Sequence, residues 1–67
     1  MRQPDRRETA VAGEVLFEIV TRGNSARCAA IDVATGVEVV VVGPPRGGDA
    51  QLKAVALRKL RMRLSRL

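Results

Sequence analysis

Apolar residues follow two different spacings along this chain of 67 residues. Between Glu14 and Val42 they tend to alternate with other residues, which is typical of strands that bury one face. From Asp49 to Leu67 they recur at steps of three and four, which is typical of an amphipathic helix. The pattern therefore predicts strands first and a single C-terminal helix after them.

Three strands are predicted, over Glu14–Thr21, Ser25–Asp32 and Val37–Val42. The first is rich in β-branched and aromatic side chains, and turn-forming residues separate the three segments. The connections are short enough to join neighbouring antiparallel strands. The chain is expected to form a β-meander.

The turns set the pairing of these strands. Gly23 and Asn24 both tolerate positive φ, so they are expected to form a two-residue hairpin turn. That turn places Ile19 opposite Cys28 and Phe17 opposite Ala30. The second turn is expected to have four residues, 33–36, with Gly36 in the left-handed conformation. A three-residue loop would set the carboxylates of Asp32 and Glu38 against each other. The four-residue loop instead sets Ala30 opposite Val39.

The C-terminal segment, Asp49–Leu67, is expected to form a helix that begins after the proline and glycine residues of 43–48. Asp49 is the expected N-cap, because its carboxylate can accept from free amides of the first turn. Val55 and Met62 are expected on the outer side, away from the sheet. The apolar stripe that should face the sheet consists of Leu52, Ala56, Leu57, Leu60, Leu64 and Leu67.

The predicted register gives the sheet one face suited to a core. Small residues in its middle strand leave room for a helix. The fold class is therefore α+β: a three-stranded antiparallel β-meander followed by one C-terminal amphipathic α-helix packed on one sheet face (βββα). The expected core positions are Val15, Phe17, Ile19, Ala26, Cys28, Ala30, Val37, Val39 and Val41.

The opposite face of the sheet, here called the outer sheet face, is expected to be apolar as well. It comprises Glu14, Leu16, Glu18, Val20, Arg27, Ala29, Ile31, Glu38, Val40 and Val42. Contiguous apolar patches of this kind often mark interfaces. A homo-oligomer or a complex with another protein is therefore expected, through this face or through an edge strand. The alternative is an exposed face without a partner, partly shielded by Arg27 and the Glu side chains. The candidate interface residues are Leu16, Val20, Ala29, Ile31, Val40 and Val42.

The domain organisation follows from the same pattern. Residues 1–12 are charged, contain a proline and lack apolar periodicity, so a disordered N-terminal tail is expected there. Residues 13–67 are expected to form one domain. A core this small supplies only about 3–5 kcal/mol. Because the lone Cys28 cannot form an internal disulfide or a structural zinc site, oligomerisation is the remaining source of extra stability, and the alternative is an efficient small monomer.

Positive charge is concentrated in the helix. The chain has 12 Lys and Arg residues and 7 Asp and Glu residues, a net charge of +5. Residues 53–67 hold six of the cations and no acid. Such a surface is either simply solvated or a contact for an anionic partner. Nucleic acid, with structured RNA in first place, is the alternative partner. The candidate contacts are Arg58, Lys59, Arg61, Arg63 and Arg66.

Other chemistry finds little support in the residues. The chain has no His, and Cys28 has no base to activate it. The connector 43–48 lacks the Lys and Ser/Thr that complete a P-loop. We expect no enzyme activity, no catalytic or metal-binding residues, no cofactor and no small-molecule substrate. No apolar run is long enough to span a bilayer, and the single cysteine fits a reducing, cytoplasmic setting.

Several short motifs in the run from Gly13 to Leu60 resemble those of a family of short, uncharacterised bacterial proteins. The motifs are GEVLFE, GNS, AID-x-ATG-x-EV, VGP and ALRKL. They consist mainly of turn and core residues, so the resemblance implies the meander-plus-helix fold and no particular activity. The basic C-terminal end and the Pro-Arg-Gly-Gly connector depart from the family pattern.

Overall fold

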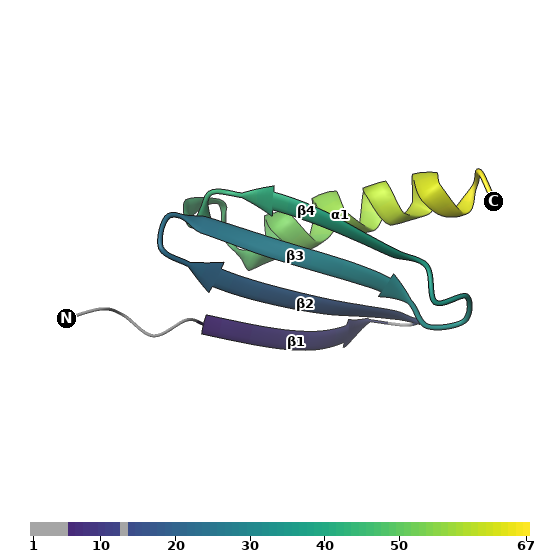
Figure 1. Cartoon of the computed structure of the whole chain (residues 1–67), viewed down its shortest axis with the longest axis horizontal. Helices are drawn as coiled ribbons and strands as arrows, with labels where there is room; N and C mark the ends of the chain where they lie inside the picture. Colours follow the sequence, from purple (N-terminus) through teal and green to yellow (C-terminus); the bar gives the residue numbers. More distant parts are fainter. Residues whose placement is uncertain (1–5, 13) are drawn as a thin grey trace.

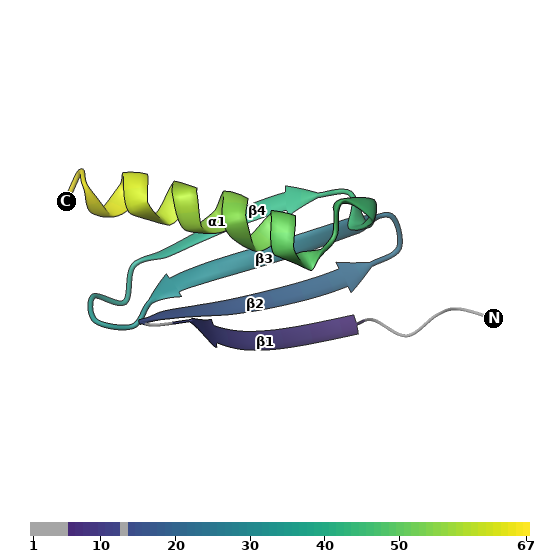
Figure 2. The same cartoon turned by 180° about the vertical axis from the view of Figure 1, so that it is seen from behind.

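The computed structural model describes residues 6–12 and 14–67, and in this part of the chain one antiparallel sheet is packed against one α-helix. The strand order is β1-β2-β3-β4, so each strand pairs with the next one in sequence. A 3₁₀ turn, η1, connects the sheet to the helix. Figure 1 views the sheet with α1 behind it, and Figure 2 shows α1 lying across the other face. The elements are β1 (Arg6–Ala12), β2 (Val15–Arg22), β3 (Ser25–Asp32), β4 (Glu38–Gly43), η1 (Pro45–Gly47) and α1 (Asp49–Leu64).

The predicted meander and C-terminal helix are confirmed, with β2, β3 and β4 as the three expected strands. The expected disordered tail is corrected for residues 6–12, which form β1. This strand pairs with β2 from Arg6↔Thr21 to Ala12↔Val15. Apolar periodicity could not reveal it, because main-chain pairing with an existing edge does not require an apolar side-chain pattern. The rest of the expected tail, residues 1–5, lies outside the described residues, as does residue 13.

The hairpin between β2 and β3 has the expected register but a different turn geometry. Arg22 pairs with Ser25 across the two-residue loop, and Ile19 pairs with Cys28. Within this loop only Gly23 has positive φ, at 58°, since no described non-glycine residue has a positive φ. Asn24 therefore does not adopt the positive φ that was expected. A glycine in the first position with positive φ is the requirement of a type II′ turn.

The turn between β3 and β4 follows the four-residue prediction. The Asp32 N–H donates to the Val37 carbonyl at 2.8 Å, and Gly36 has φ 76°. One carboxylate oxygen of Asp32 accepts from the Thr35 hydroxyl at 2.6 Å and from the Thr35 N–H at 3.1 Å. These bonds order the loop and fix the pairing of Ala30 with Val39.

The N-cap of the helix lies one residue earlier than expected. Gly48, with φ 83°, is the N-cap, and Asp49 is the first helical residue; no side chain caps this end. Only glycine adopts such a φ readily, so the chain can enter the helix sharply here. The helix ends at Leu64 rather than Leu67, and the Ser65 N–H donates to the Arg61 carbonyl at 3.0 Å.

The core lies between α1 and the face of the sheet that was expected to be covered. Leu60 is fully buried at the centre of the helical stripe, opposite the small residues of β3. Leu67 is the exception to the predicted stripe, because it follows the end of the helix and is 76% exposed. The buried core residues are Phe17, Ile19, Cys28, Ala30, Val39, Ala56 and Leu60, and Val15, Val37, Val41, Leu52, Leu57 and Leu64 pack against them.

Candidate functional surfaces

The outer sheet face lies on the side of the sheet that α1 does not cover (Figure 1). Strand pairing brings its residues into three rows across β2, β3 and β4. Because paired residues of a sheet point to the same side, each row forms a continuous strip. The rows are Leu16–Ile31–Glu38, Glu18–Ala29–Val40 and Val20–Arg27–Val42.

All six apolar candidates of the predicted interface therefore lie side by side on one surface. Ala29 is at the centre of the middle row and is only 8% exposed, because larger neighbours surround its methyl group. Val42 is at the margin and is 67% exposed. The remaining four, Leu16, Val20, Ile31 and Val40, are half-buried. The centre of this apolar surface therefore carries a small side chain, and larger apolar side chains surround it.

Both signs of charge border this apolar surface. Arg27 lies in one outer row and Glu38 in the opposite outer row, four residues apart along the strands. At about 3.3 Å per residue the separation is roughly 13 Å, too far for an ion pair within one chain. Glu18 occupies the middle row beside Ala29. The surface thus carries an unlike pair of charges at its two ends.

The free edge of β4 is partly covered by the helix. The Val37 carbonyl bonds to β3, so in an antiparallel strand the main-chain groups of Glu38, Val40 and Val42 point to the open side. The ammonium group of Lys59 donates to the Val40 carbonyl at 2.9 Å. A lysine at this position occupies the middle of the edge, a known way to discourage edge-to-edge pairing. Sequence reasoning placed Lys59 only among the anion contacts.

The five cations predicted to contact anions are all exposed on α1 or just beyond it. At 3.6 residues per turn, Arg61 and Arg58 lie about 100° and 160° around the axis from the buried Leu60. Those two arginines therefore point away from the sheet, and the exposed Arg66 follows the end of the helix. Arg63 and Lys59 lie on the flank that faces β4.

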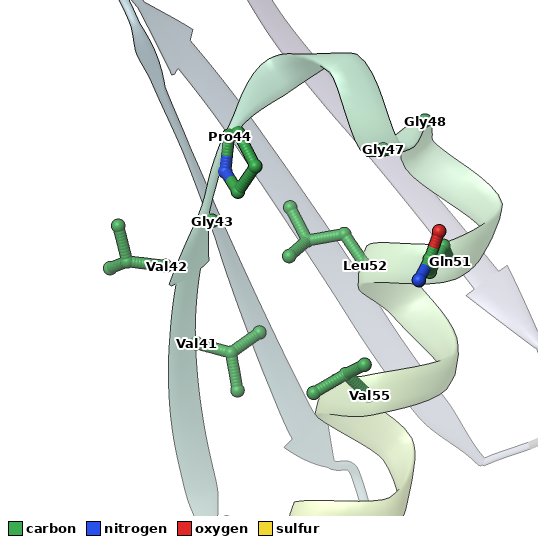
Figure 3. Close-up of a pocket in the computed structure, with 9 residues that line it drawn as sticks. All are labelled: Val41, Val42, Gly43, Pro44, Gly47, Gly48, Gln51, Leu52 and Val55. Atoms are coloured by element: carbon green, nitrogen blue, oxygen red, sulfur yellow. The ribbon is translucent and has the colours of Figure 1, made fainter.

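A small groove lies where β4, the connector and the start of α1 meet (Figure 3). Its cavity volume is about 210 Å³, below the roughly 300 Å³ typical of small-molecule sites. Val55 lines it and is half-buried, so its expected position on the outer side of the helix is corrected. A Cβ at Gly43 would lie 3.5 Å from Leu52 Cδ1, an ordinary van der Waals contact, so the packing here does not require glycine.

Cys28 is fully buried in the core. Burial raises the pKa of its thiol, while the nearby Lys53 ammonium acts in the opposite direction. A buried, protonated thiol is a poor nucleophile. Among the described residues, no group of His, Cys, Asp and Glu is placed to hold a metal ion. Within the same part of the chain, no helix has the length and apolar character needed to cross a membrane.

Comparison with known proteins identifies a family. The model of a family described as a domain of unknown function (DUF6898) matches residues 12–67. The matched range contains β2, β3, β4 and α1, including the basic end of the helix, but only the last residue of β1. No curated protein matches the chain, and no solved structure matches it.

Proposed function

Because the chain belongs to the DUF6898 family, whose function is unknown, we propose a function from its surfaces alone: it is a small interaction module that self-associates through its outer sheet face. The observation that carries the proposal is the uncovered apolar surface formed by the three register rows. Its partner is a second copy of the same chain. Two sheets packed in this way would form a sandwich with its inner faces about 10 Å apart.

The size of the face supports this partner. Strands of six to eight residues make a four-stranded sheet about 25 Å long and 19 Å wide, a flat area of roughly 500 Å². Two copies would together cover roughly 1,000 Å², the lower bound of a specific interface. Side-chain relief adds to this area. A second core would also supplement the small one under α1.

The charges of the two outer rows also support a second copy, whereas Glu18 of the middle row would lie close to its own counterpart. In a twofold-symmetric dimer each face meets itself, so the face must complement itself. A twofold axis running across the strands near Ala29 exchanges the two outer rows. Arg27 of one copy then lies beside Glu38 of the other, and the reverse contact forms as well. Arg27 and Glu38, whose positions are roughly 13 Å apart along the strands of one chain, would each gain a partner in the dimer.

The face, rather than the β4 edge, is the proposed route. Lys59 already bonds to the Val40 carbonyl in the middle of that edge. Edge pairing would have to displace this bond and bring two lysines together. The substitution Lys59→Gln therefore separates the routes: it should leave dimerisation through the face unchanged and should strengthen dimerisation through the edge.

The test is the molar mass in solution. The chain has no Trp or Tyr, so light scattering with refractive-index detection, rather than absorbance, should give the mass at high micromolar concentration. The expected mass is twice the 7.2 kDa of one chain. A mass of one chain under these conditions would refute self-association.

The matched variants locate the interface. Ile31→Gln with Val40→Gln places four amides in the symmetric interface, each costing about 1 kcal/mol or more if unpaired. Dimerisation should weaken by at least about 10³-fold. The control, Val33→Gln with Leu67→Gln, changes two exposed residues off the face and should leave the dimer intact. Equal effects of the two pairs would show that the outer sheet face is not the interface.

A further inference from the structure

The outward surface of α1 is a second candidate binding surface. Arg58 and Arg61 point away from the sheet, the exposed Met62 lies beside Arg58 at about 200° from Leu60, and Arg66 is exposed just beyond the helix. Arg63 extends the same charge towards β4. No acid occurs in residues 53–67. Neighbouring arginines at steps of three repel one another, which an anionic partner would relieve.

Most of the acids of the described residues lie outside α1. Glu18 and Glu38 lie on the outer sheet face, Asp32 is in the β3–β4 turn and Asp49 begins the helix. Within α1 the only acid is therefore Asp49, in the first turn, and the stretch 53–67 that carries the arginines has none. A polyanion approaching α1 would meet cations without a competing carboxylate on that surface.

The chemistry of the surface selects the kind of polyanion. Single-stranded nucleic acid is usually bound by stacking bases on aromatic rings, but the only aromatic residue of the chain, Phe17, is buried in the core. Membrane binding by a helix needs a broad exposed apolar face, and here Met62, 52% exposed, stands among arginines. Arginine is suited to phosphate oxygens. The phosphate backbone of a duplex offers these oxygens and can be bound without aromatic rings or a broad apolar face.

We propose that α1 binds the phosphate backbone of a nucleic-acid duplex, and that the dimer joins two duplexes because it carries one such helix on each side. The second part rests on the proposed self-association. With the outer sheet faces together, the two helices would lie on opposite surfaces, roughly 30 Å apart. A single straight duplex cannot lie along both surfaces at once.

The binding part is tested by the salt dependence of affinity for short RNA and DNA duplexes, measured by fluorescence anisotropy. About four arginine–phosphate contacts predict a slope near −3.6 in log K against log salt. Affinity should then fall roughly 150-fold between 50 and 200 mM salt. Arg58→Gln with Arg61→Gln should reduce the slope to about −1.8, a loss of roughly 12-fold over the same range.

The control variant removes the same charge from outside the helix. Arg22 and Arg46 lie in the β2–β3 hairpin and the connector, so Arg22→Gln with Arg46→Gln should leave the slope unchanged. Equal slopes for the two double variants would overturn the assignment to α1. Tighter binding to single strands than to duplexes, or binding to anionic vesicles without binding to duplexes, would overturn the choice of partner.

The bridging part is tested by energy transfer between two duplexes, one labelled with a donor and one with an acceptor. The wild-type protein should bring them together. Ile31→Gln with Val40→Gln should abolish transfer while keeping the salt slope of each chain. A dimer that binds duplexes without transfer would refute bridging alone. A monomeric wild type would refute the proposed function, and the salt slopes would still decide whether α1 binds phosphates.

Discussion

The substitution Leu60→Ala tests whether the helix stripe holds this fold together. Leu60 is fully buried between α1 and the sheet. Removing its isobutyl group takes away about 2–3 kcal/mol of transfer free energy and leaves a cavity that its neighbours fill only in part. The expected loss in the free energy of unfolding is about 3–5 kcal/mol. That is comparable with the whole stability expected of a core of this size.

The assay is urea denaturation followed by far-ultraviolet circular dichroism, with Leu67→Ala as the matched control. Leu67 is 76% exposed, so the same change there should cost less than about 0.5 kcal/mol. The half-buried Leu57 should give an intermediate loss. Leu60→Ala should be largely unfolded without urea. Similar losses for Leu60→Ala and Leu67→Ala would refute the packing of α1 on the sheet. Because the proposed dimerisation would stabilise the folded state, all variants must be compared at one concentration, and the midpoint should rise with concentration.

Three further predictions concern the core thiol and the β3–β4 turn. Native Cys28 should resist iodoacetamide until the chain unfolds. The free energy of unfolding should fall as the pH rises above about 8.5, because the unfolded thiol then loses its proton while burial holds the pKa of the native thiol higher. A Cys28→Ala variant with the same pH dependence would contradict this. Thr35→Val should lower the unfolding free energy by about 1 kcal/mol, since it removes the hydroxyl that donates to Asp32 and accepts from the Val37 N–H. Thr35→Ser keeps the hydroxyl and should cost clearly less in the same urea titration. Gly36→Ala should lower the unfolding free energy by about 1–2 kcal/mol because residue 36 has a φ of 76°. Gly36→Asn should lower it less, because asparagine tolerates this conformation. Equal thermal midpoints for the wild type and both variants would show that a side chain at this position has no conformational cost.

The sequence by itself determined the meander, its register and the helix that covers it. These features depend on local spacing: a two-residue loop fixes the pairing of Ile19 with Cys28, and like charges on Asp32 and Glu38 disfavour the shorter second loop. Register then decides which side chains share a face, so the core and the outer sheet face followed from the same step. The stripe ending in Leu64 was equally visible, because a period of 3.6 places it on one side.

Only the tertiary structure decided what depends on main-chain bonds and on distant segments. The strand Arg6–Ala12 pairs with β2 through backbone groups. Every residue except proline carries the same backbone donor and acceptor, so this pairing does not require a periodic side-chain pattern that the sequence could show. Lys59 and Val40 are 19 residues apart, and their bond exists because α1 crosses the sheet beside β4. The same crossing turns Val55 towards the groove rather than to solvent. Local chemistry can predict the faces of strands and helices, but which edges and flanks are covered is set by how those elements are placed against one another.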